Sequence, residues 1–157
     1  MLFFIHTVSI GILATLFMDL FSIINKKLFK ITPLNYAIIG RWVLHWKSCK
    51  FAHNNIMQTQ TLKNELVLGW IIHYITGVSW TYLYFVMCTY FSYEINLLNT
   101  IIFTSITTLL PFMVIQPFLG FGFFAYKTPS PIHSIRNSLI AHITFGVGIF
   151  YSYKILQ

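Results

Sequence analysis

Four polar residues interrupt otherwise apolar stretches of this chain, and their types could do chemistry: Asp19, His73, Gln116 and His142. An ionisable side chain within a membrane segment is costly, so by default it faces the protein interior or a water-filled cavity. A buried Asp–His pair could take up and release a proton near neutral pH. Two histidines on different helices could ligate a haem iron, but nothing else marks a redox chain, and we expect no cofactor and no metal.

A second group of residues could bind an anion. The stretch Gln116–Pro129 breaks a long apolar segment with a proline and with Gly120 and Gly122, and Lys127 follows near its end. Basic side chains beside glycine amides suit a phosphate or another anionic head group. The basic residues that could take part are Arg41, Lys127 and Arg136.

Composition indicates that membrane-spanning helices position these residues. Of 157 residues, 57% are hydrophobic and only 8% are charged, against roughly 25% charged in a soluble domain. Four segments approach the ~20 apolar residues that a spanning helix needs. They are approximately Leu2–Ile24, Leu66–Phe91, Leu97–Leu119 and Ser138–Leu156. The sequence therefore predicts a single integral membrane domain, an all-α four-helix transmembrane bundle. Its net charge of +7 indicates membrane topology and not a nucleic-acid site.

The distribution of bases predicts the orientation. The first loop, residues 25–65, holds seven Lys and Arg, and the short second loop holds none. The third loop, residues 120–137, holds Lys127 and Arg136. The positive-inside rule places the first and third loops in the cytoplasm and both termini on the opposite side. Of the two cysteines, Cys49 falls in the first loop and Cys88 near the outer end of the second helix, too far apart to pair.

The first loop is predicted to contain a helix of its own. Thr32-Pro33 resembles an N-cap followed by proline at the first helical position, ahead of a run from Leu34 to Trp46. On a helical wheel Trp42 and Trp46 share an apolar face with Ile39 and Val43, while Arg41 and His45 lie opposite. Tryptophans flanked by lysines favour a helix at the cytoplasmic membrane interface.

The predicted topology puts the four polar residues at one depth. Each lies within roughly 5–10 Å of the cytoplasmic edge of its helix at 1.5 Å per residue. We expect one polar layer, covered by the loop from Gly120 to Pro129. Small residues one turn from each histidine, at Gly69, Gly77 and Gly146, would let a neighbouring helix approach closely.

The second and fourth helices also resemble each other. His73, Gly77 and Tyr82 align without a gap to His142, Gly146 and Tyr151. This indicates a parallel two-helix repeat related by an axis along the membrane normal, with a chance match between aromatic-rich helices as the alternative.

Three functions remain open on this reading. The first is a protein that binds or moves a small anionic ligand or lipid head group, with proton coupling as an option and with a homodimer compatible with only four helices. The second is a membrane-embedded enzyme that acts on a lipid or quinone, with Asp19 and a histidine as acid and base. The third is a structural or assembly partner, in which the polar residues only cross-link helices by hydrogen bonds.

An ordered series of short motifs also carries a family resemblance. The chain resembles an uncharacterised family of small four-helix bacterial inner-membrane proteins, a domain of unknown function. The resemblance implies a bacterial source and an inner-membrane location, and it implies no activity. The motifs are Met18-Asp19-Leu20, Gly40-Arg41-Trp42, Phe51-Ala52-His53, His73-Tyr74-x-x-Gly77, Gln116-Pro117-x-x-Gly120-x-Gly122, Lys127-Thr128-Pro129 and Arg136-x-Ser138-Leu139-x-x-His142.

Overall fold

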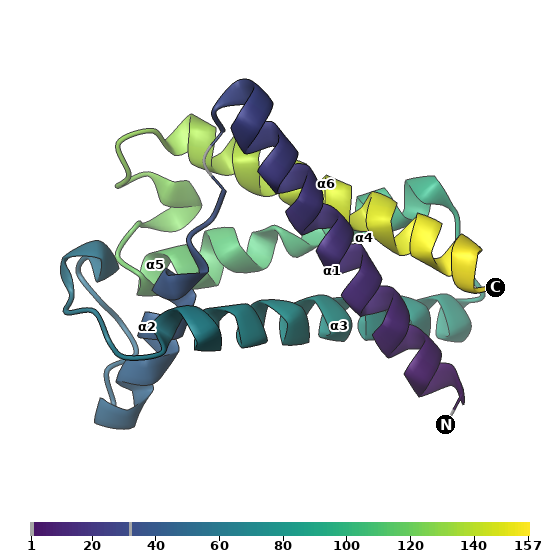
Figure 1. Cartoon of the computed structure of the whole chain (residues 1–157), viewed down its shortest axis with the longest axis horizontal. Helices are drawn as coiled ribbons and strands as arrows, with labels where there is room; N and C mark the ends of the chain where they lie inside the picture. Colours follow the sequence, from purple (N-terminus) through teal and green to yellow (C-terminus); the bar gives the residue numbers. More distant parts are fainter. Residues whose placement is uncertain (1, 32) are drawn as a thin grey trace. The chain divides into compact units, whose positions relative to one another are not determined.

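The computed structural model describes every residue except Met1 and Thr32. For Leu2 it describes the backbone but not the side chain. The described residues form helices and no strands (Figure 1). The helices are α1 (Leu2–Phe29), α2 (Tyr36–His45), α3 (Glu65–Phe91), α4 (Leu97–Thr107), α5 (Gln116–Phe118) and α6 (Pro131–Leu156). Short helical turns are η1 (Trp46–Ser48), η2 (Ile56–Gln58) and η4 (Phe123–Ala125), and η3 (Pro111–Ile115) is a π-helical segment.

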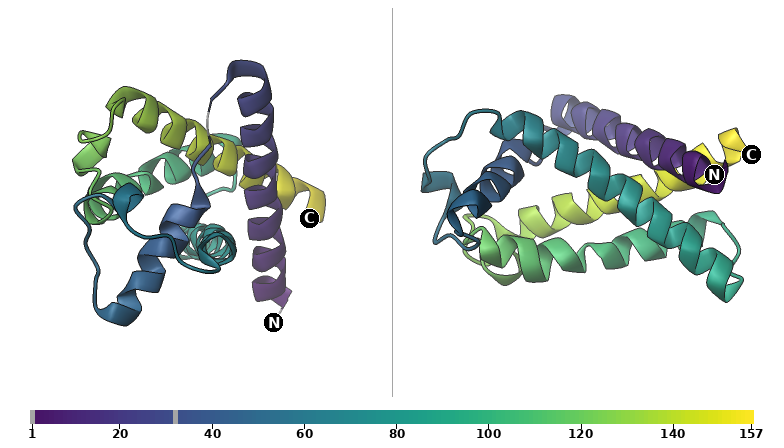
Figure 2. Two further views of the ribbon diagram at one scale, coloured as in Figure 1. Left: turned by 60° about the vertical axis from the view of Figure 1, so that its left-hand side comes forward. Right: turned by 90° about the horizontal axis from the view of Figure 1, so that it is seen from below.

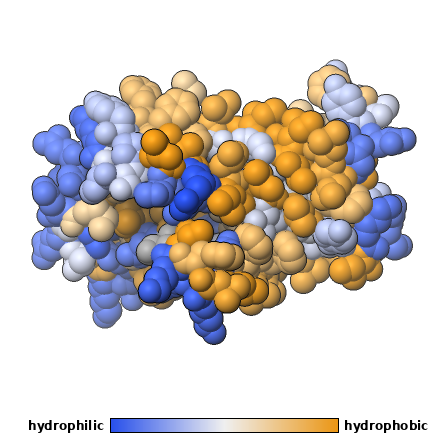
Figure 3. Space-filling view, turned by 90° about the horizontal axis from the view of Figure 1, so that it is seen from above, coloured by the Kyte–Doolittle hydropathy of each residue, from blue (hydrophilic) through white to orange (hydrophobic). Residues whose placement is uncertain are grey.

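Four helical stretches are long and apolar enough to cross a membrane: 3–29, 65–91, 97–118 and 131–156. They carry large apolar side chains on their outer surfaces, such as Phe4, Ile75 and Leu98, each at least 60% exposed. Apolar residues, orange in Figure 3, are correspondingly spread over much of the visible surface. Water-soluble proteins rarely expose so much apolar surface, so the predicted fold class, an all-α membrane protein with four spanning helices, is confirmed.

The predicted helix ends need correction in three places. The first helix continues to Phe29, five residues beyond Ile24, and the fourth begins at Pro131 instead of Ser138. Proline is well suited to the first turn of a helix because its missing N–H would have no intrahelical partner there. The loop helix α2 begins at Tyr36, with the Asn35 side chain accepting from the amide of Ala37, so Asn35 is its N-cap; Thr32 lies outside the described residues.

The third spanning helix ends within one residue of its predicted end at Leu119. It runs through α4, η3 and α5 to Phe118, and the irregularity lies earlier, at Pro111. There the amide of Gln116 donates to the carbonyl of Pro111, five residues back, which is the π-helical pattern. Because proline lacks an N–H, the regular hydrogen-bond ladder is interrupted at this point, and the wider turn accommodates the interruption.

The chain divides into two compact units, and α3 and α6 each contribute to both. Unit 1 comprises Met1–Pro33, Tyr74–Thr108 and Leu139–Gln157, and unit 2 comprises Leu34–His73 and Leu109–Ser138. Figure 2 shows α3 and α6 as unbroken helices along their whole length.

Small and hydroxyl residues pack the helices of unit 1. A side chain at Gly77 would collide with Thr15 of α1, and one at Gly146 would collide with Thr104 of α4. The close approach predicted for these glycines is therefore confirmed. The buried threonines satisfy their hydroxyls within their own helices; Thr15 donates to the Gly11 carbonyl at 2.7 Å, and Thr104 to the carbonyl four residues back.

Unit 2 is built around the crossing of α2 and the first turns of α3. A side chain at Gly40 would overlap the Glu65 carbonyl, and one at Gly69 would overlap the Tyr36 carbonyl. Arg41, which the helical wheel places opposite Trp42, is only 8% exposed and is buried together with Ile38. A small apolar cluster of Ile38, Ile56 and Leu119 completes the unit.

Candidate functional site

The glycine-containing loop after α5 has a fixed backbone. Gly120 and Gly122 adopt φ values of +86° and +74°, which side chains other than glycine rarely tolerate. The loop is closed by backbone hydrogen bonds from Phe121 to the Gln116 carbonyl at 2.8 Å and from Lys127 to the Phe121 carbonyl at 2.9 Å. Both glycines therefore shape a tight turn, whereas their role in binding a ligand remains a prediction.

A second segment from far away in the sequence lies against this turn. His53 donates its amide to the Phe118 carbonyl at 2.8 Å, and Ile56 donates to the Leu119 carbonyl at 3.0 Å. A side chain at Gly120 would collide with the Asn54 carbonyl. Two features therefore require glycine at position 120: the positive φ and the close approach of the Asn54 backbone.

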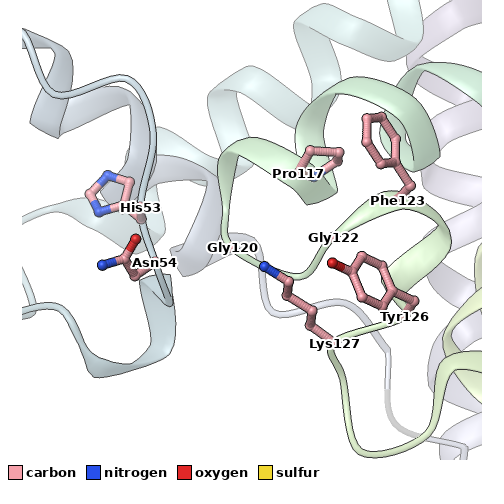
Figure 4. Close-up of a pocket in the computed structure, with 8 residues that line it drawn as sticks. All are labelled: His53, Asn54, Pro117, Gly120, Gly122, Phe123, Tyr126 and Lys127. Carbon is pink, nitrogen blue, oxygen red and sulfur yellow. The ribbon is translucent and has the colours of Figure 1, made fainter.

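Between the two segments lies a cavity of about 370 Å³, which is entirely within unit 2 (Figure 4). In Figure 4 the Lys127 ammonium and the Tyr126 hydroxyl point to the same side of the loop, whereas the His53 ring points away from Lys127. The lining combines one cation, polar groups, glycine backbone and two aromatic rings. The lining residues are His53, Asn54, Pro117, Gly120, Gly122, Phe123, Tyr126 and Lys127.

The charge of Lys127 has no counter-charge in the described part of the chain. Its Nζ lies 5.6 Å from the centroid of the Tyr126 ring, a cation–π contact, and the one salt bridge found among the described residues is elsewhere. Unit 2 contains six Lys and Arg and a single acid, Glu65. The cavity is consequently positive, and an anion is the ligand that its electrostatics favour.

The carboxylate of that single acid, Glu65, is paired with Arg41. The guanidinium makes a bidentate pair with Glu65 at 2.8 Å for both contacts and donates to the carbonyls of Ile56 and Thr59 at 3.1 and 3.2 Å. The hydrogen bond to Glu65 raises the pKa of Arg41 further. Arg41 does not line the cavity, and its donors are committed to the fold of unit 2.

The remaining predicted residues of unit 2 have other surroundings. Arg136 is exposed and donates to the Asn137 side chain next to it, at 3.2 Å from Nη2. His73 stacks on Tyr36, with ring centroids 4.0 Å apart, and also contacts Trp70. Gln116 has a buried side-chain oxygen with no hydrogen-bond partner among the described residues. None of these three residues lines the cavity.

Asp19 and His142 belong to unit 1. Asp19 is 8% exposed and accepts a hydrogen bond from the Tyr74 hydroxyl. His142 Nδ1 lies 2.8 Å from the Thr107 hydroxyl and 3.2 Å from the Thr104 carbonyl. A carbonyl can only accept, so Nδ1 carries the proton in this arrangement. The single polar layer predicted from sequence draws on both units and remains a prediction.

Sequence reasoning missed the residues opposite the glycine turn. Neither Asn54 nor Tyr126 is among the binding residues predicted from the sequence, although both line the cavity. The one available signal was the motif Phe51-Ala52-His53, which ends at the point where the loop meets Gly120. Their juxtaposition depends on backbone pairing between segments about sixty residues apart, which no local pattern encodes.

The four spanning-length helices define the class, a multi-pass helical membrane protein. Within that class, the profile of the family described as "Protein of unknown function (DUF2938)" matches residues 8–156, and the chain belongs to this family. No curated protein and no solved structure matches the chain.

Proposed function

We propose that this membrane protein binds a small anionic group, a phosphate or carboxylate, in the cavity between the glycine turn and the 53–54 segment. The observation that carries the proposal is the Lys127 ammonium, which lies in the cavity wall and has no carboxylate partner among the residues that the structure describes. The Tyr126 hydroxyl would supply a second hydrogen-bond donor to the same anion. The neighbouring aromatic rings suit a ligand whose anionic group is attached to an apolar part, as in a lipid head group.

The proposal includes a location and an orientation. We place the protein in a bacterial inner membrane, with its basic loops in the cytoplasm and both termini in the periplasm. In this orientation the cavity would be accessible from the cytoplasm or the inner leaflet. The anionic inner leaflet would also attract the basic surface of unit 2, at about 1 kcal/mol per Lys or Arg near the surface. A free phosphate metabolite and a lipid head group share the required chemistry, so the experiment has to separate them.

The test uses the full-length chain purified in detergent. Binding is measured by calorimetry with inorganic phosphate, and separately with nanodiscs of phosphatidylglycerol or phosphatidylcholine. Lys127→Met should weaken anion binding about tenfold to a hundredfold, because a hydrogen bond to a charged group is worth about 1.5–3 kcal/mol. Lys63→Met removes an exposed base of the same unit that does not line the cavity, and should change affinity less than twofold.

The result also separates the alternatives. Binding of phosphate alone would indicate a soluble ligand, and preference for phosphatidylglycerol would indicate a lipid. Equal effects of the two lysine variants, or no binding of either anion, would overturn the proposal and favour a structural or assembly role. Release of a modified lipid during incubation would instead indicate the membrane-embedded enzyme.

A further inference from the structure

His45 and His53, both in unit 2, form a second polar cluster. His45 is the last residue of α2, and the centroids of the two imidazole rings are 5.0 Å apart with an angle of 65° between their planes. The His53 ring points away from Lys127 in Figure 4. His53 thus lines the proposed anion cavity but turns its ring toward His45, so the pair shares one residue with that cavity and uses neither Lys127 nor Tyr126.

Three ring nitrogens of this pair are buried and have no hydrogen-bond partner in the described part of the chain. They are Nε2 of His45 and both Nδ1 and Nε2 of His53, whose side chain is only 6% exposed. Buried polar atoms in proteins nearly always have a partner. Three such atoms on two adjacent rings indicate that something outside the chain completes the site.

The chemistry of the pair favours a metal ion over an anion. Burial, together with the charges of Lys50 and His45, lowers the pKa of His53. Imidazole ligates metals through the lone pair of an unprotonated ring nitrogen, and burial disfavours the protonated ring.

We propose that His45 and His53 together bind one transition-metal ion of the zinc class. Two imidazoles on one tetrahedral ion, each with its nitrogen about 2.0–2.1 Å from the metal, have ring centres roughly 5 Å apart. The observed 5.0 Å agrees with this geometry. No third His, Cys, Asp or Glu joins the pair among the described residues, so water or an added ligand would fill the remaining positions.

The charge of Lys50 predicts the direction of a change in metal affinity, and this direction can be tested. Its positive charge acts on His53 and opposes the binding of a cation. Lys50→Gln should tighten metal binding a few-fold, whereas the same change at a base far from the pair should not.

The experiment measures Zn²⁺ binding to the tag-free full-length chain in detergent by calorimetry, and Co²⁺ binding by visible absorption. We expect one ion per chain and tetrahedral Co²⁺ bands, with at least a tenfold loss of affinity in His45→Gln and in His53→Gln. His133→Gln removes an exposed histidine of the same unit and should leave binding unchanged. Zinc-edge X-ray absorption of the wild-type chain should show two imidazoles.

Three outcomes would overturn the metal site. One is the absence of saturable Zn²⁺ binding, which would mean that a buried water only completes the pair. The second is equal loss in the His133 variant, and the third is an absorption spectrum without imidazole scattering. If His53→Gln does not fold, His45→Gln and the wild-type spectrum still decide. Lys127→Met should leave Zn²⁺ binding intact, so failure of the anion site and failure of the metal site are distinguishable.

Discussion

Arg41 and Glu65, 24 residues apart, face each other with two parallel 2.8 Å contacts, Nε to Oε2 and Nη2 to Oε1. Glu65 also accepts the Leu62 amide, while Arg41 reaches the carbonyls of Ile56 and Thr59. One ion pair thus connects α2, the loop after η2 and the start of α3. A bidentate arginine is well suited to this task because its planar fork presents several donors in fixed directions.

Breaking this pair on one side should destabilise unit 2 strongly. Arg41→Met leaves the Glu65 carboxylate, whose side chain is only 13% exposed, without its partner, which costs about 3–5 kcal/mol for a buried pair. Thermal unfolding in detergent measures the loss. Arg136→Met, at an exposed arginine, is the control and should change stability little. The double variant with Glu65→Leu should recover most of the loss; no recovery would show that the pair is not the source.

The α2–α3 crossing gives a second prediction. Gly69→Ala places a methyl group against the backbone carbonyl of Tyr36, which cannot move aside as a flexible side chain could. Overpacking of this kind costs about 1–3 kcal/mol. Ser79→Ala, at an exposed position on the same helix, should be nearly neutral. An unfolding midpoint of the Gly69 variant equal to that of wild type would contradict the close crossing.

The sequence predicted the spanning helices well because hydropathy over some twenty residues is a strong and local signal. It predicted their ends less well, since Pro131 can begin a helix as readily as it can end one. The Thr32-Pro33 pair predicts an earlier start for α2, whereas the side chain that caps the helix is that of Asn35. The partners of Arg41 and Gly120 could not be predicted, because they depend on contacts between distant segments.

In unit 1 the hydrogen bond from His142 to Thr107 joins α6 and α4, and we expect it to contribute measurably to stability. Thr107→Val should cost about 0.6 kcal/mol, with about 1.7 as the upper bound known for such bonds in membrane helices. Thr144→Val is the matched control because the Thr144 hydroxyl bonds only within its own helix, to the Ile140 carbonyl. A larger loss in the control would show that the interhelical bond is not what stabilises this contact.

The same pair can be tested by a double-mutant cycle. His142→Phe combined with Thr107→Val should cost less than the sum of the single changes, because the bond between Nδ1 and the hydroxyl is removed by either one. Strict additivity in SDS-induced unfolding would mean that the two side chains do not interact.

The two native cysteines allow the proposed orientation to be tested without engineered labels. Cys49 is exposed in the first loop, whereas Cys88 is 6% exposed, and neither forms a disulfide. A membrane-impermeant maleimide should therefore react once per chain, at Cys49. If the first loop is cytoplasmic, labelling should occur in inverted membrane vesicles and not in intact spheroplasts, and Cys49→Ser should abolish it. Labelling of Cys49 in spheroplasts would reverse the topology, and the cavity beside Lys127 would then have to take its anion from the periplasm.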